Sequence, residues 1–101
     1  MESSELVNAL KALSVPARLK IVELLRSRRL CVNALTKRLG ISQPAVSQHL
    51  GILRRAGLVE SQKIGTKVHY SVNSVRLEQI KTALSRVGLE SESKAESVFL
   101  R

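Results

Sequence analysis

Aspartate and tryptophan are missing from this chain of 101 residues, and tyrosine, phenylalanine and cysteine each occur only once. With so few aromatic side chains, the core must be built mainly from Leu, Val, Ile and Ala, and Leu-rich amphipathic stretches predict a mainly helical fold. The single cysteine excludes an internal disulfide. Without Asp, a Gly-rich phosphate loop or paired metal ligands, the chain lacks the common catalytic arrangements, so we expect neither an enzyme nor a cofactor.

Long apolar runs are also missing. No stretch approaches the ~20 apolar residues that a membrane-spanning helix needs. The first residues, MESSELVNAL, lack the basic region and the apolar stretch of a signal peptide. We therefore expect a cytoplasmic protein. Its length predicts one domain, with residues 1–87 structured and the polar residues 88–101 forming a flexible tail.

Acidic residues are few, because eight Glu oppose 17 Lys and Arg and leave a net charge of +9. Residues 16–57 contain nine of these cations and a single Glu, so the basic block lies in the middle of the chain. A small domain this basic is typical of a nucleic-acid-binding protein, with a membrane surface as the competing partner. We expect nucleic acid as the partner and no membrane.

Three amphipathic helices are predicted in the first 40 residues. The first contains the apolar side chains between residues 6 and 13. The second is predicted to be capped by Ser14 and has Pro16 in its first turn, where the missing N–H costs little. The third is predicted to be capped by Asn33 and to end at Gly40 in the left-handed conformation.

The segment SQPAVSQHLGILRRAG, residues 42–57, predicts a helix that starts two residues after the third one ends. Two short helices joined so tightly form a helix-turn-helix. Val46, Leu50 and Leu53 share the inner face. The outer face begins with amides and hydroxyls, which can bond base edges in the major groove, and ends with Arg, which can reach phosphates. Gly51 on this face lets the helix lie close to the groove wall.

After Gly57 the hydrophobic period changes to two, and Gly65 marks a turn between two alternating stretches. This pattern predicts a two-stranded hairpin with Lys63 and Lys67 at its tip, placed as a wing that reaches a phosphate or the minor groove. Together the two motifs predict double-stranded DNA as the partner. The predicted DNA-contacting residues are Ser42, Gln43, Pro44, Ser47, Gln48, Arg54, Arg55, Lys63 and Lys67.

A last helix is predicted to be capped by Asn73 or Ser74. Its residues Leu77, Ile80 and Leu84 recur at spacings of three and four, which is a narrow seam suited to a partner helix. The predicted fold is therefore mainly α with a small β-hairpin. It is a winged helix-turn-helix with five helices and a two-stranded wing.

Three segments, ALSVPARLKIVELL, LCVNAL and LGISQPAVSQHLGILRRAGLVESQKIGTKVHYSV, strongly resemble the ArsR/SmtB family of winged-helix repressors. The resemblance covers residues 6 to about 87, and the run SQPAVSQHL with the following AGLV is its specific part. It implies a repressor that binds palindromic operators as a homodimer built from the first and last helices. The dimer residues expected on this basis are Leu6, Leu10, Leu77, Ile80 and Leu84.

The metal sites that many members of this family use are incomplete here. One site resembles Cys-Val-Cys at the start of the third helix, where this chain has Cys31, Val32 and Asn33. A single thiolate is a poor site for a soft metal ion. The other site uses Asp and His on the last helix, and residues 74–87 contain neither. We expect no metal site, and the releasing signal stays unknown.

Cys31 admits two interpretations. It is either a small apolar side chain in the core or a thiol activated for oxidation by a helix N-terminus, with Arg28 and Arg29 close in sequence. The second interpretation predicts a redox-responsive repressor.

His49 and Arg18 also admit two roles each. His49 is a structural side chain at the edge of the buried face, or a base contact or pH sensor. Arg18 either contacts a phosphate or bonds within the chain, to a carbonyl or to Glu23.

Other functions predict different behaviour. An RNA or single-strand binder needs aromatic platforms, and this chain has only Tyr70 and Phe99. A winged helix that binds proteins predicts no DNA affinity. A non-specific architectural protein predicts DNA binding without base preference.

Overall fold

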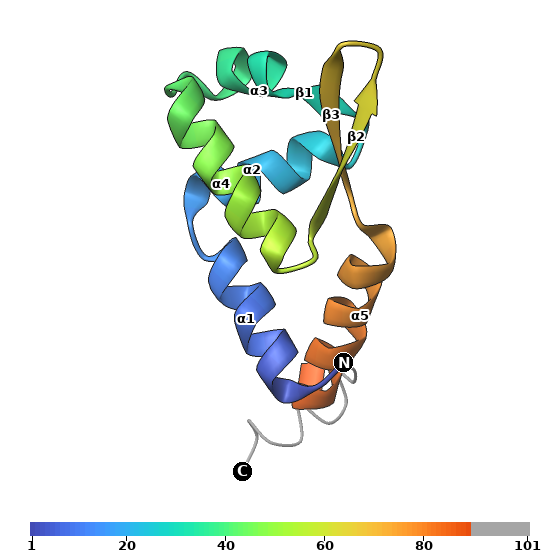
Figure 1. Cartoon of the computed structure of the whole chain (residues 1–101). Coiled ribbons are helices and arrows are strands. Elements are labelled where there is room, and N and C mark those ends of the chain that lie inside the picture. Colours follow the sequence, from blue (N-terminus) through green and yellow to red (C-terminus); the bar gives the residue numbers. More distant parts are fainter. Residues whose placement is uncertain (90–101) are drawn as a thin grey trace.

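A computed structural model describes residues 1–89, which form a winged helix-turn-helix with five α-helices, as the sequence predicts (Figure 1). The helices are α1 (Ser3–Leu13), α2 (Pro16–Leu25), α3 (Val32–Leu39), α4 (Gln43–Arg55) and α5 (Ser74–Leu84). The strands are β1 (Leu30–Cys31), β2 (Val59–Ile64) and β3 (Lys67–Val72). A π-helical turn, η1 (Ser85–Leu89), continues α5. The tail predicted for residues 88–101 lies outside the described residues, apart from its first two.

The sheet has one strand more than the predicted wing. Strands β2 and β3 form the expected antiparallel hairpin, and β1 pairs with the other edge of β3 to give the order β1-β3-β2. In β1, Leu30 lies opposite Tyr70 and Cys31 lies opposite His69. A strand of two residues is too short to show the alternation that identifies strands in a sequence, so this one could not be predicted.

Two helices begin at residues other than those expected. Val15, not Ser14, is the N-cap of α2, because the residue before a proline favours extended backbone. The Ser14 hydroxyl instead donates to the Lys11 carbonyl at the end of α1. Cys31, not Asn33, is the N-cap of α3, since its extended backbone ends β1 at the point where the helix begins.

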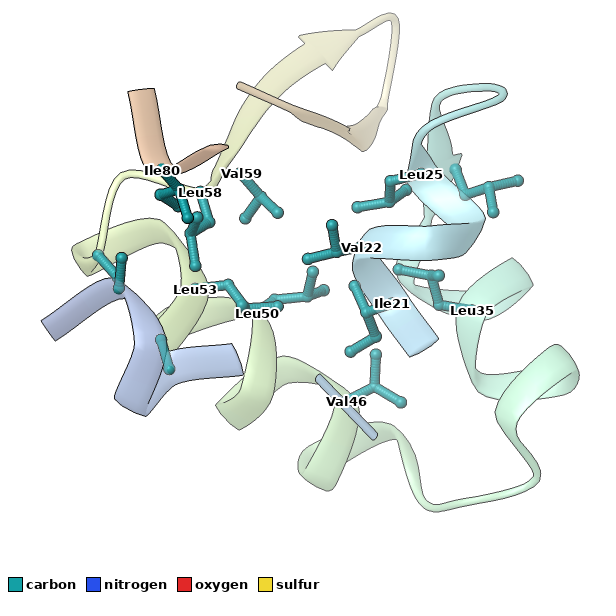
Figure 2. Packing of buried hydrophobic residues seen from close by; sticks show 14 residues of the cluster. Ile21, Val22, Leu25, Leu35, Val46, Leu50, Leu53, Leu58, Val59 and Ile80 are labelled. Atoms are coloured by element: carbon teal, nitrogen blue, oxygen red, sulfur yellow. The ribbon is translucent and has the colours of Figure 1, made fainter. Parts of the chain in front are cut away.

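The hydrophobic core lies between α2, α3, α4 and the start of the sheet, and α1 and α5 also contribute buried side chains to it (Figure 2). Val46, Leu50 and Leu53 of α4 are all buried, which confirms the predicted inner face of this helix. Ile21 of α2 and Leu58 after α4 are fully buried beside them. Each such side chain contributes roughly 1.5–3 kcal/mol when removed from water, so the core holds α4 in a fixed orientation.

Helices α1 and α5 lie next to each other at the end of the molecule away from the wing (Figure 1). Arg76 of α5 pairs with Glu5 of α1 at 3.5 Å, and Glu5 also accepts the Glu2 backbone N–H at 2.8 Å. The Arg76 guanidinium also covers Gly57, where an added Cβ would lie 3.0 Å from its Nε and where φ is +77°. One arginine therefore contacts α1 and the turn after α4. Over residues 1–89, none of the helices is long and apolar enough to cross a membrane.

Candidate nucleic-acid interface

The turn between α3 and α4 is tight, as predicted. Gly40 follows α3 with φ of +68°, the left-handed conformation that suits glycine. Ser42 is the N-cap of α4, and its hydroxyl oxygen accepts the Ala45 backbone N–H at 3.3 Å. Pro44 lies in the first turn of α4, where its missing N–H leaves no bond unmade. This arrangement leaves the N-terminus of α4 exposed at a corner of the molecule (Figure 1).

Helix α4 has a buried face and an exposed face that bears the predicted DNA-contacting side chains. Its apolar residues pack into the core, and the side chains on the other side are polar or basic. All seven predicted residues at this helix are exposed, including its N-cap: Ser42, Gln43, Pro44, Ser47, Gln48, Arg54 and Arg55. The outer face is therefore available to a partner.

The outer face of α4 is hollowed near its C-terminal end. Gly51, Arg54 and Arg55 line this hollow. A Cβ added at Gly51 would lie 3.5 Å from Arg55 Nη1, which is ordinary contact, so the glycine is not required by packing within the chain. The missing side chain instead leaves space on the surface that the sequence predicts to face DNA.

The wing carries its lysines at its tip. Ile64 pairs with Lys67 across a two-residue turn, and Lys63 lies opposite Val68. Lys63 and Lys67 are both exposed. Arg29 before β1 donates from Nη1 to Gln62 Oε1 at 2.9 Å, which connects strand β2 to the segment after α2.

Positive charge on the helix-turn-helix and the wing is not compensated by carboxylates within residues 1–89. The ion pairs of this part of the chain join Arg76 to Glu5 and Lys81 to Glu78, all on α1 and α5. The cations at the end of α4 and at the wing tip take part in neither pair. Exposed cations without partners favour a polyanion such as the phosphate backbone of DNA.

Cys31 lies at the N-terminus of α3, beside the wing. The backbone N–H of Ala34 lowers the pKa of the Cys31 thiol, Lys67 of the wing lowers it further, and burial opposes both. The neighbouring cation is thus Lys67, whereas the sequence suggested Arg28 and Arg29. Cys31, Lys67 and Gln43 share the lining of a hollow of about 180 Å³ between α3, α4 and the wing.

The described residues bring together no group of three or more His, Cys, Asp or Glu side chains. The expectation that this protein has no metal site stays a prediction. His49 lies half-buried at the edge of the inner face of α4, and its Nδ1 is buried without a hydrogen-bond partner. If His49 has a structural role, this role therefore does not rely on a hydrogen bond of Nδ1 within residues 1–89.

The residues expected at a dimer interface lie in different environments. Ile80 is 6% exposed and belongs to the core of its own chain, and Leu6, Leu77 and Leu84 pack partly against that core. Leu10 is exposed on α1.

Another face of α5 was missed by the sequence reasoning. Val75, Gln79, Thr82 and Arg86 follow one another at spacings of four and three, and with Met1 they line a hollow of about 350 Å³. Val75 is 69% exposed. A large apolar side chain at this exposure, beside an apolar hollow, is the signal of a protein contact. The spacing of Leu and Ile residues in the sequence did not indicate this face, because Val75 lies outside that seam.

A tight two-helix turn, an exposed polar helix and a basic hairpin define a winged helix-turn-helix DNA-binding regulator. A family model described as "Bacterial regulatory protein, arsR family" matches residues 15–61. The biofilm growth-associated repressor of Xylella fastidiosa is 34% identical over 93 residues, covering 92% of this chain and 82% of the relative. The chain belongs to the ArsR/SmtB family of transcriptional regulators.

Solved structures agree with this assignment. An ArsR-like transcriptional regulator from Rhodococcus sp. RHA1 is similar with a TM-score of 0.80 at 30% identity, covering 94% of this chain and 90% of that one. A homodimeric winged helix-turn-helix DNA-binding domain from Mycobacterium bovis is similar with a TM-score of 0.69 at 28% identity, covering 86% and 83%. This chain is accordingly a DNA-binding transcriptional regulator and not an enzyme.

Proposed function

We propose that this regulator is a homodimeric, sequence-specific repressor that binds palindromic operators in double-stranded DNA. The observation that carries the proposal is the outer face of α4. Its amides, hydroxyls and arginines are all exposed. Within residues 1–89, its cations have no carboxylate partner. This face meets base edges and phosphates when α4 lies in the major groove.

The two ends of α4 have different roles in this proposal. Gln43, Ser47 and Gln48 at the N-terminal half bond base edges, and a Gln side chain can bond adenine through two atoms. Arg54 and Arg55 at the C-terminal half bind phosphates, which fix the position of the helix without selecting a sequence. Ser42 and Pro44 shape the N-terminus that enters the groove.

The wing adds a second contact to the same DNA. Lys63 and Lys67 at its tip bind a neighbouring phosphate or reach the minor groove. Because each such cation releases counterions from DNA, both lysines raise the affinity in a salt-dependent manner. They do so for every DNA sequence alike.

Dimerisation through α1 and α5 would give the operator its symmetry. Support comes from the exposed Val75 and Leu10 at this end, and from the homodimeric relative of similar fold. The outward face of α5, beginning at Val75, contributes more than Ile80, which its own chain already buries. A dimer places two recognition helices about 34 Å apart on one side of the duplex.

Repression and location in the cytoplasm are parts of the same proposal. A relative that matches most of this chain is named a repressor. A dimer bound over a promoter excludes other proteins from that DNA, and such a protein acts where the chromosome is.

The rival functions are separated by one set of binding measurements. Fluorescence anisotropy with duplex DNA, single-stranded DNA and RNA of equal length should give tightest binding to the duplex. Analytical ultracentrifugation of the complex should give two chains per operator. Preference for single strands would support an RNA or single-strand binder. No affinity for any nucleic acid would support a protein-interaction module.

A redox-responsive form of this repressor is a second candidate, favoured by the lowered pKa of Cys31 and by its shared hollow with Gln43 and Lys67. A peroxide would transfer one oxygen to the thiolate to give a sulfenate, with water as the other product. The test is DNA affinity before and after peroxide, in the wild type and in Cys31→Ser. Oxidation should weaken the wild type alone, and equal affinity in all four samples would remove this candidate.

A further inference from the structure

The end of α1, the start of α2 and the end of α4 converge on one side of the molecule (Figure 1). A hollow of about 340 Å³ lies between them. Its polar lining comes from all three helices: Asn8 and Lys11 from α1, Arg18 from α2 and Arg55 from α4. Among the residues that the structure describes, the rest of the lining is apolar and includes no carboxylate. Three cations and one amide therefore meet around an open space.

Arg18 is the anchor of this group. Its side chain is half-buried, and its Nε is buried without a hydrogen-bond partner in residues 1–89. It forms no ion pair with Glu23, which was one of the two intramolecular partners considered from the sequence, the other being a carbonyl. A buried N–H of a charged group without a partner is costly. Such a group points to a ligand that is absent from the free chain.

We propose that Arg18, Lys11 and Arg55, together with the Asn8 amide, form a binding site for a phosphate-class oxyanion. A guanidinium presents a planar fork of N–H donors that matches the oxygens of a phosphate, and its bonds to an anion are charge-assisted. Lys11 and Arg55 supply two further positive charges. The open side of the hollow admits a tetrahedral anion without moving the backbone.

Arg55 connects this hollow to the outer face of α4. It also lines the second hollow with Gly51 and Arg54, and its Nη1 lies near Gly51 on the DNA-facing surface. The phosphate can therefore have two sources. A backbone phosphate beside the recognition helix would strengthen DNA binding, whereas a free phosphate-bearing anion would compete with DNA for Arg55. Only the link between this site and DNA binding rests on the proposed function, because anion binding itself does not require DNA.

The first experiment follows the arginine Nε–Hε signals in a nitrogen–proton correlation spectrum while inorganic phosphate replaces chloride at constant ionic strength. The Arg18 signal should shift with a saturating curve. The Arg76 signal, from an arginine that already pairs with Glu5, should not. In Arg18→Gln, the Arg55 signal becomes the reporter, and phosphate should bind about tenfold more weakly.

A matched pair of variants separates the site from general positive charge. Lys11→Gln and Lys20→Gln each remove one exposed lysine, and only Lys11 lines the hollow. Phosphate should bind several-fold more weakly to Lys11→Gln and unchanged to Lys20→Gln. Circular dichroism checks that all variants keep the wild-type helix content.

The second experiment measures the salt dependence of duplex binding for the same pair. If a backbone phosphate occupies the site, Lys11→Gln should lower the slope of log affinity against log salt by about one and Lys20→Gln should not. If the slopes agree and phosphate still shifts the Arg18 signal, the site takes a free anion.

The proposal is overturned if phosphate shifts Arg18 no more than chloride does and Lys11→Gln keeps the wild-type slope. It is also overturned if the two lysine variants behave alike in both experiments. A protein that binds no duplex would contradict the proposed function alone, and the phosphate titration would then decide this site.

Discussion

The two ends of this molecule carry their charge in different ways. At the helix-turn-helix and wing, residues 32–72, arginines and lysines stand exposed, and none takes part in an ion pair within residues 1–89. At the α1/α5 end, Arg76 pairs with Glu5 and Lys81 with Glu78, and apolar side chains such as Val75 are exposed beside them. A surface of unpaired cations suits a polyanion, whereas a surface of paired charges and apolar groups suits another protein.

One small chain therefore presents two separate binding surfaces. The core between them, centred on α2 and the inner face of α4, fixes their relative position (Figure 2). A change on either surface should therefore act through the contacts made there, without disrupting the fold. Four predictions test this difference.

The largest effect is expected at the α1/α5 end. Val75→Glu places a charge on a 69% exposed apolar residue of α5 and should convert the proposed dimer to a monomer. Operator affinity should fall about 100-fold or more, because the two half-sites are no longer bound by linked subunits. Sedimentation and anisotropy measure the two quantities. Leu19→Glu, at a 48% exposed apolar residue of α2, is the control and should stay dimeric. A monomer with unchanged operator affinity would contradict the role of dimerisation.

The next effect is expected on the outer face of α4. Gln48→Ala should change the preferred base at one position of the operator, with a loss of about 1–3 kcal/mol on the original sequence and little on others. Lys63→Ala on the wing should weaken all duplexes alike and reduce the salt slope by about one. Binding is measured on a set of single-base operator variants. Equal losses on every duplex for Gln48→Ala would show that this side chain does not select bases.

A smaller effect is expected from Gly51→Ala. The new methyl group meets only Arg55 Nη1, at 3.5 Å, and alanine favours a helix by up to ~1 kcal/mol over glycine. The free energy of unfolding should therefore rise, while DNA affinity should fall because the helix can no longer lie as close to the groove. Urea unfolding and anisotropy give the two values. A variant that is more stable and binds DNA as tightly as the wild type would remove the proposed reason for this glycine.

The smallest effect concerns the paired charges of α1. The Glu2 backbone N–H and Arg76 lower the pKa of Glu5 below its usual value of 4.5. A carboxylate with a lowered pKa stabilises the fold above its unfolded pKa, and this contribution is lost as the pH falls through the folded value. Glu5→Gln should therefore be less stable than the wild type at pH 7, and the difference should shrink as the pH falls below the usual pKa of 4.5. Urea unfolding at a series of pH values measures it, with Glu78→Gln as the control.

The sequence predicts well what is local and periodic. The inner face of α4, the left-handed Gly40, the Ser42 cap and the basic wing tip all follow from spacing and residue type, and the structure confirms their geometry. Strand β1 is too short for any period to appear. Spacing alone also does not predict which surface the Leu and Ile residues of α5 face. Their pattern is the same whether they pack in the core of their own chain or against a partner.

Contacts between distant segments could not be predicted either. Lys67 reaches the neighbourhood of Cys31 only because β1 pairs with β3. Lys11, Arg18 and Arg55 come from three helices, and nothing in their separate sequence contexts indicates that they line one hollow. Only the tertiary arrangement of the helices shows that these side chains lie together.

Sequence selection by the outer face of α4, in a symmetric dimer, can be tested with a randomised duplex library. The protein is incubated with the library at physiological salt, and the bound fraction is sequenced. We expect an enriched inverted repeat with half-site centres about one helical turn, or a multiple of it, apart. A bound fraction without any enriched motif would contradict sequence selection, because the protein would then bind phosphates alone.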